Sequence, residues 1–428
     1  MRRRPESLWR NGAFRNLWLA HSVSLVGTHV TMLAFPMAAL LLHASALEVS
    51  LLAAVEFLPV LLLGLPAGAW VERLPLRPVL IITDLVRAAA LVTVPVAYAL
   101  DLLTMPLLYV VAFAIGLGTL FFDVAQLSLL PGLVEEEQLT SGNAKLETSR
   151  SVAQLAGPAV GGVLVQALTA PVALAMDVLS YLASAVFLLR VPATTTEAIV
   201  ENPEPATKNE GLRAEIGEGL RFVFGHRLLR PIVLCAGAAE LAFAAVLALQ
   251  VVYAVNVLHL SAGVVGAALA IGNAGGLLGA MLSTPAVERF GPGRALIGSV
   301  AVFAAGALMI PMAGGAVGFG AGLFVVYLGV VLFNVVQTTL CQMATPARLL
   351  GRMNATLRFI TWGTVPLGAA LGGLLVAPLG LRGVLWLAGA ITVVSIVPPL
   401  FSPVRALMSY PSANEPAADE PVRAGSPA

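Results

Sequence analysis

The chain has few charged residues for its length. Only 11% of its 428 residues are charged, whereas soluble domains carry about 25%. Hydrophobic residues make up 58% of the sequence and the mean hydropathy is +0.91. This balance excludes an ordinary soluble domain and indicates a polytopic membrane protein. The net charge of +1 also argues against a nucleic-acid partner.

Cysteine and the common chemical motifs are also scarce. The two cysteines, Cys235 and Cys341, both lie in apolar runs, which argues against a disulfide framework or a metal site. The chain has no Gly-x4-Gly-Lys-Ser/Thr motif, so ATP is not expected to be the direct energy source. No spacing of metal ligands or of a Ser/His/Asp triad is evident. We therefore expect no metal, no cofactor and no enzymatic activity.

Twelve apolar stretches have about the 20 residues that a helix needs to cross the hydrocarbon core. None of them alternates as a barrel strand does, so each is predicted to be a helix and the fold an all-α membrane protein. The first stretch is too long for the ~7–15-residue core of a signal peptide and is expected to remain uncleaved. The twelve stretches are 16–42, 48–71, 78–100, 106–130, 147–168, 171–190, 231–257, 261–286, 295–313, 316–341, 353–377 and 381–401.

Lysine and arginine predict the orientation of these helices. When the N-terminus is placed inside, every basic residue except Arg382 falls on the inner side of the membrane. Such an inside excess is the usual determinant of topology. The sequence therefore predicts a multi-pass protein of the cell (inner) membrane with both termini in the cytoplasm.

A polar interval divides the spans into six plus six. Its first part has no apolar periodicity and is predicted to be a flexible linker. Its second part places Leu212, Ile216, Leu220 and Phe224 four residues apart, which predicts an amphipathic helix on the inner membrane surface. The predicted organisation is a first half at 1–191, the linker with its helix at 192–230, a second half at 231–401 and a disordered tail at 402–428.

The two halves also share sequence features. Segment 123–165 aligns without a gap to 334–376, and the polar interval lies between them. The clearest match is between two glycine motifs, Gly157-x3-Gly161-Gly162 and Gly368-x3-Gly372-Gly373. Two homologous six-helix halves related by an axis along the membrane normal are typical of secondary transporters.

Three stretches resemble the Major Facilitator Superfamily, and within it the twelve-helix drug:proton antiporter branch that includes macrolide-efflux and enterobactin-exporter types. They read GAWVERLPLRPVLIITDLVRA, LPGLVEEEQLTSGNAKLETSRSVAQLAGPAVGGVLV and AMDVLSYLASAVFLLRV. The resemblance extends from Phe14 to Phe401. It implies two six-helix halves that transport a small molecule by alternating access.

The resemblance further implies a gate at the inner ends of the helices. The first stretch resembles the family's charged turn between spans 2 and 3, which latches the outward-facing state. Glu72 stands where Asp is usual, and the glycine expected before Arg77 is absent. Ordinary positive-inside anchoring explains the same charges. The gate residues are Gly68, Glu72, Arg73, Arg77 and Asp123, with Glu288, Arg289 and Arg294 as their counterparts in the second half.

An acid deep inside a predicted span is unusual, because a charge at mid-bilayer costs at least ~2.5–3.5 kcal/mol. Glu56, Glu240 and Asp177 are therefore candidates for proton coupling or substrate contact. Each can instead be a protonated, hydrogen-bonded structural residue. Span 106–130 lacks the arginine of many proton-coupled relatives, so the resemblance alone does not imply coupling. Because the spans hold few basic residues, a neutral or cationic substrate is favoured over an anion.

Small and polar residues in the spans predict packing and cavity contacts. Gly157, Gly161 and Gly162 allow close helix approach, and Pro158 bends its helix. In the resembling family this motif is associated with exporters. Two polar residues, Gln154 and Asn273, either line a cavity or form interhelical hydrogen bonds.

The sequence thus predicts a secondary active exporter of hydrophobic small molecules, of the drug or antibiotic type, that acts by proton antiport. The expected partners are a neutral or cationic small molecule, protons and membrane lipid, and the chain is expected to be a monomer. Two alternatives stay open. One is a lysophospholipid or siderophore mover of the same fold, and the other is a membrane receptor or assembly partner without transport activity.

Overall fold

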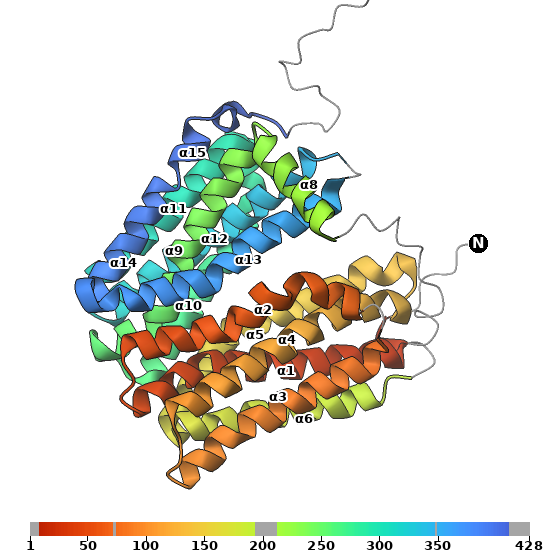
Figure 1. Ribbon diagram of the computed structural model, residues 1–428, viewed down its shortest axis with the longest axis vertical. Helices are drawn as coiled ribbons and strands as arrows, with labels where there is room; N and C mark the ends of the chain where they lie inside the picture. The colour runs from red at the N-terminus through yellow and green to blue at the C-terminus, as the bar shows by residue number, and fades with distance from the viewer. Residues whose placement is uncertain (1–7, 72–73, 193–211, 347–348, 411–428) are drawn as a thin grey trace, which may run out of the picture.

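The structure is a computed structural model that describes residues 8–71, 74–192, 212–346 and 349–410 (Figure 1). Within these ranges the regular secondary structure is helical throughout. The first half contains α1 (Gly12–Leu41), α2 (Ala46–Val71), α3 (Leu76–Ala99), α4 (Met105–Leu133), α5 (Glu136–Leu168) and α6 (Ala170–Leu189). The second contains α9 (Leu229–Asn256), α10 (Ala262–Phe290), α11 (Pro292–Met312), α12 (Ala316–Met343), α13 (Leu350–Leu374) and α14 (Val376–Val394). The short helices are η1 (Leu8–Arg10), α8 (Leu212–Gly225), α15 (Val397–Leu400) and η3 (Pro403–Ala406).

Eleven helices in the described ranges are long and apolar enough to cross a membrane. Of the twelve long helices, α13 falls short, and it carries Arg352 and Arg358 in its first half. It nevertheless packs closely on α9 and α2, so it belongs to the bundle. The predicted all-helical fold is confirmed, whereas the membrane crossing of α13 stays a prediction.

Local capping signals explain where the first helices begin. The Asn11 side chain accepts hydrogen bonds from the backbone N–H groups of Ala13 and Phe14, at 3.0 and 3.1 Å, and thereby caps α1. Ser45 and Glu48 form a reciprocal capping box at the start of α2. The Glu48 carboxylate accepts a hydrogen bond from the Ser45 N–H at 2.7 Å, and the Ser45 hydroxyl accepts one from the Glu48 N–H at 3.3 Å.

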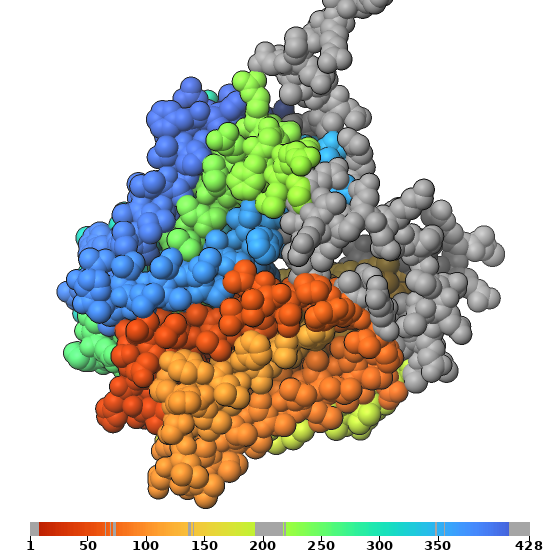
Figure 2. All heavy atoms as spheres, viewed as in Figure 1, coloured from red at the N-terminus to blue at the C-terminus, as the bar shows by residue number. Residues whose placement is uncertain are grey.

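The helices form two six-helix bundles. Figure 1 shows α1–α6 below and α9–α14 above, with α2 against α13 and α5 near α10. These two helix pairs make the main contacts between the halves. In the space-filling view of Figure 2, atoms of α2 and α13 touch along the boundary.

The buried core is distributed differently at the two ends of the bundle. We call the end that holds η1 and α8 the linker end, and the end that holds the α1–α2 and α9–α10 connections the distal end. At the distal end, one apolar core contains side chains from both halves. At the linker end, each half has its own core. Apolar burial therefore joins the halves at the distal end and leaves them separately packed at the linker end.

Candidate functional site

The glycine motif of α5 packs on two partners at once. A Cβ atom at Gly157 would overlap the Cβ of His29 on α1, and one at Gly161 would lie 3.2 Å from the Cα of Val30. Gly162 faces the other half, where a Cβ would lie 2.6 Å from the carbonyl oxygen of Ala262 at the start of α10. The predicted close packing thus occurs both within the half and between the halves.

The matching motif of α13 repeats this division. Gly368 and Gly372 pack on α9, and a Cβ at Gly372 would lie 2.9 Å from the Cβ of Ala245. Gly373 faces α2 of the first half, where a Cβ would lie 2.7 Å from the Cβ of Ser50. The third glycine of each motif therefore contacts the opposite half, as a pseudo-two-fold relation requires.

Pro158 explains a polar contact between the halves. Proline has no N–H, so the carbonyl oxygen four residues before it, that of Gln154, has no helical donor. Asn273 of α10 supplies one, because its Nδ2 donates to this oxygen at 2.6 Å. Neighbouring helices commonly satisfy backbone groups that a proline frees within a membrane. The two predicted polar residues thus meet in one interhelical hydrogen bond.

Asp177 on α6 is fully buried and hydrogen-bonded. Its carboxylate accepts from the Thr31 hydroxyl of α1 at 2.5 Å and from the Ser180 hydroxyl at 2.7 Å. A side chain at Gly27 would overlap this carboxylate, so α1 approaches it closely. These contacts favour a structural role within the first half over direct substrate contact.

Glu56 and Glu240 lie in different halves, on α2 and α9, and both are partly buried. Among the described residues, neither side chain has a hydrogen bond or an ion pair. Glu56 does interact electrostatically with Asp177, so two of the three predicted acids are near each other. Glu240 stands apart from them.

Asp84 and Arg87 form a buried ion pair beside these acids. From the sequence, Arg87 is interpreted only as a basic residue on the inner side of the membrane. Arg87 Nη2 is 2.5 Å from Asp84 Oδ1 on α3, and the two side chains are 3% and 0% exposed. The guanidinium also lies over the rings of Phe122 and Tyr181, at 4.6 and 4.4 Å from their centroids. An acid and an arginine three residues apart inside an apolar run are a sequence signal that identifies such a pair.

The predicted gate of the first half is only partly described, because Glu72 and Arg73 lie outside the described residues. Among the described atoms, none lies within 4 Å of a Cβ position at Gly68. Arg77 donates to the carbonyl oxygens of Leu188 and Leu189 at 3.1 and 2.5 Å, at the end of α6. It therefore caps a helix of its own half.

Asp123 on α4 is partly buried and interacts electrostatically with Arg150 and Arg87. The second-half residues Glu288, Arg289 and Arg294 are exposed at the linker end, on α10 and α11. In the described part of the chain, the ion pairs are Asp84–Arg87 and Glu147–Arg150, so none joins these gate residues. The gate stays a prediction.

Metal and thiol chemistry find no support in the described ranges. No group of three or more His, Cys, Asp or Glu side chains there is arranged to hold a metal ion. Cys235 and Cys341 are both buried free thiols.

Comparison with known proteins places this chain in a family. The model of the Major Facilitator Superfamily matches residues 17–365. The chain is 26% identical to macrolide efflux protein A of Streptococcus pyogenes over 412 residues, which covers 92% of this chain and 97% of that protein. It is 30% identical to the multidrug efflux pump Tap of Mycolicibacterium fortuitum, over 49% of this chain and only 51% of the length of Tap. The crystal structure of nucleoside transporter NupG matches with a TM-score of 0.76 at 10% identity, over 91% of this chain and 99% of NupG.

Proposed function

The chain belongs to the Major Facilitator Superfamily, and we propose that it is a proton-coupled exporter of hydrophobic, neutral or cationic small molecules. The named function of two similar proteins, macrolide and multidrug efflux, supports an exporter over an importer. In this proposal the halves rock about a central site and expose it to each side of the membrane in turn.

The observation that carries the proposal is the division of the buried core. One core joins the halves at the distal end, whereas the linker end has two separate cores. Because each half has its own core at the linker end, the halves can move relative to each other as rigid bodies without unfolding either bundle. The lysine and arginine distribution predicts that the linker end faces the cytoplasm, which is the side from which an exporter loads.

For coupling, we propose that Glu56 or Glu240 exchanges a proton for the substrate. Glu56 lies on α2 and Glu240 on α9, and neither side chain has a hydrogen-bond or ion-pair partner among the described residues. Glu56 is favoured because it interacts with Asp177, which in turn interacts with Arg87. Gain or loss of a proton by Glu56 therefore changes the charge balance of a buried cluster that joins α1, α3 and α6.

The test measures transport of ethidium, a lipophilic cation, and of a neutral macrolide by the full chain in proteoliposomes with an imposed pH gradient. We expect gradient-driven transport by the unaltered chain. Glu56→Gln or Glu240→Gln should reduce that transport at least tenfold while leaving gradient-free counterflow measurable.

Glu147→Gln is the matched control, because this acid is 71% exposed in a loose pair with Arg150. Undiminished coupling in both the Glu56 and Glu240 variants would remove these acids from the mechanism. Absence of transport of either compound by the unaltered chain would argue against a drug exporter.

A further inference from the structure

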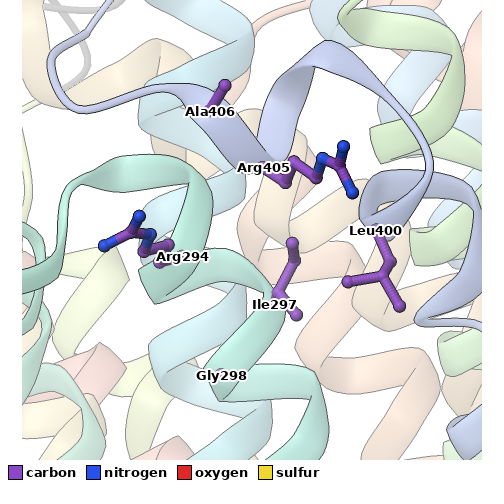
Figure 3. A pocket seen from close by; sticks show the side chains of 6 residues that line it. All are labelled: Arg294, Ile297, Gly298, Leu400, Arg405 and Ala406. Carbon is purple, nitrogen blue, oxygen red and sulfur yellow. The ribbon is translucent and has the colours of Figure 1, made fainter.

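The second half carries a pocket at the linker end that the transport proposal does not use. The pocket has a volume of about 520 Å³ and lies between the first turns of α11 and the segment that follows α14 (Figure 3). Its lining residues are Arg294, Ile297, Gly298, Leu400, Arg405 and Ala406. Two arginines and two large aliphatic side chains thus share one pocket that no acidic residue lines.

Backbone contacts hold the two sides of this pocket together. The Gly293 N–H of α11 donates to the Leu407 carbonyl oxygen at 3.2 Å. Gly291 has a φ of +78°, and a Cβ there would lie 2.8 Å from the Cα of Met408. A glycine is therefore required where the start of α11 meets the segment after α15. Val404, between the two walls, is fully buried. The residues that follow α15 are therefore fixed against the start of α11, and they carry Arg405 to the same pocket as Arg294.

Both arginines are available to a ligand. Arg294 and Arg405 are exposed, and within the described residues neither guanidinium has a hydrogen-bond or ion-pair partner. Figure 3 shows the two side chains extending from different elements in opposite directions, with Ile297 between them, so each guanidinium stands at its own side of the pocket. A guanidinium is always charged and its fork of N–H donors matches the oxygen atoms of a phosphate.

The side chains next to the pocket are apolar and exposed. Phe401, directly after α15, is 78% exposed, and Leu400 within the pocket is 38% exposed. Large exposed apolar side chains beside the end of a membrane-crossing helix are expected to contact acyl chains. The pocket thus combines a cationic rim with an adjoining surface suited to hydrocarbon.

We infer that this pocket binds an anionic phospholipid of the adjacent leaflet, with the headgroup at the cationic rim that Arg294 and Arg405 form and the acyl chains along Leu400 and Phe401. Basic pockets between membrane helices at the cytoplasmic side are suited to anionic headgroups. The arginine distribution predicts that side for the linker end. Because this site lies on the second half alone, the inference does not depend on the proposed export function.

The test is lipid binding by native mass spectrometry of the detergent-purified full chain, titrated with phosphatidylglycerol or phosphatidylcholine. We expect phosphatidylglycerol to bind more tightly than phosphatidylcholine. Arg294→Gln/Arg405→Gln should weaken phosphatidylglycerol binding about 30-fold, from the usual contribution of two basic residues near a charged leaflet. Arg221→Gln/Arg230→Gln is the charge-matched control and should leave the affinity within about threefold of the unaltered chain.

Three outcomes would overturn the inference. One is equal binding of the two lipids, and another is equal loss of binding in the control variant. The third is binding of glycerol phosphate as tight as that of phosphatidylglycerol, which would indicate a soluble phosphate ligand.

A second variant tests the chain's own tail as the occupant, since Glu415, Asp419 and Glu420 follow Arg405 closely in sequence. With all three changed to their amides, phosphatidylglycerol affinity should stay within about threefold of the unaltered chain. Lipid binding that appears only in this variant would identify the tail as the occupant and overturn the inference.

Discussion

Replacing Arg87 by methionine should destabilise the first half more than any comparable change at the surface. The change removes a guanidinium that contacts Asp84 at 2.5 Å and lies over two aromatic rings, while it preserves most of the side-chain length. It leaves the Asp84 carboxylate buried, with no other cation at hydrogen-bonding distance among the described residues. We therefore predict a large loss of stability from a single substitution.

The magnitude follows from the burial of the pair. Both side chains are at most 3% exposed, so water does not screen the charge that remains. Removing one partner of a buried pair costs about 3–5 kcal/mol. Changing both residues, as Asp84→Leu/Arg87→Met, removes the uncompensated charge, and such replacements are commonly neutral or stabilising. The double variant should therefore be more stable than Arg87→Met alone.

The assay is the unfolding free energy in mixed micelles, measured by denaturant titration for each variant. Arg150→Met is the matched control, because its pair with Glu147 is 3.9 Å long and largely exposed. Such pairs contribute about 0–1 kcal/mol. A loss below about 1 kcal/mol for Arg87→Met, or a double variant as unstable as the sum of its single changes, would refute this account of the buried pair.

Three further changes test contacts elsewhere in the chain. Gly162→Val should cost about 1–3 kcal/mol by overpacking the interface between the halves, whereas Gly298→Val, with no atom within 4 Å of its Cβ position, should have little effect on the same denaturant titration. Asn273→Ala should cost about 1 kcal/mol by leaving the Gln154 carbonyl without its donor, and an unchanged unfolding free energy would contradict the proline argument. Burial lowers the pKa of His226, so the unfolded chain binds more protons, and stability at the start of α9 should be present above about pH 6.5 and fall below it. Amide hydrogen exchange there at pH 5.5 and 7.5 measures this effect, which His226→Asn should abolish.

The fold was largely readable from the sequence because the bilayer imposes a simple rule on it. A stretch of about 20 apolar residues has few alternatives to a membrane helix. The predicted boundaries differ most where water, not lipid, surrounds the helix. Helix α5 begins at Glu136, well before the predicted start at 147, since its first turns are polar and give no hydropathy signal. Helix α13 shows the reverse difficulty, because Arg352 and Arg358 reduce the signal of a helix that packs in the bundle.

The candidate site was less predictable because its contacts join residues far apart in sequence. Spacing identified the glycine motifs, yet only the fold shows that Gly161 faces α1 and Gly162 faces α10. The bond from Asn273 to the carbonyl of Gln154 depends on the pairing of α5 with α10, which periodicity does not specify. Asp84 and Arg87 were detectable from their spacing, but a positive-inside count treats Arg87 only as a topology determinant.

The position of each interhalf contact along its helices constrains how the proposed rocking would proceed. Gly162 and Gly373 make their contacts near the distal ends of α5 and α13, where backbones approach too closely for any larger residue. The Asn273–Gln154 bond lies near the middle of α10 and α5. If the halves rock about their midplane, the displacement is largest at the ends and smallest at the centre. The distal glycine contacts must therefore separate, while the Asn273–Gln154 bond can persist as part of the pivot. Gly162→Val should then hinder transport more than its cost in stability implies, because it disturbs a contact that must re-form in every cycle.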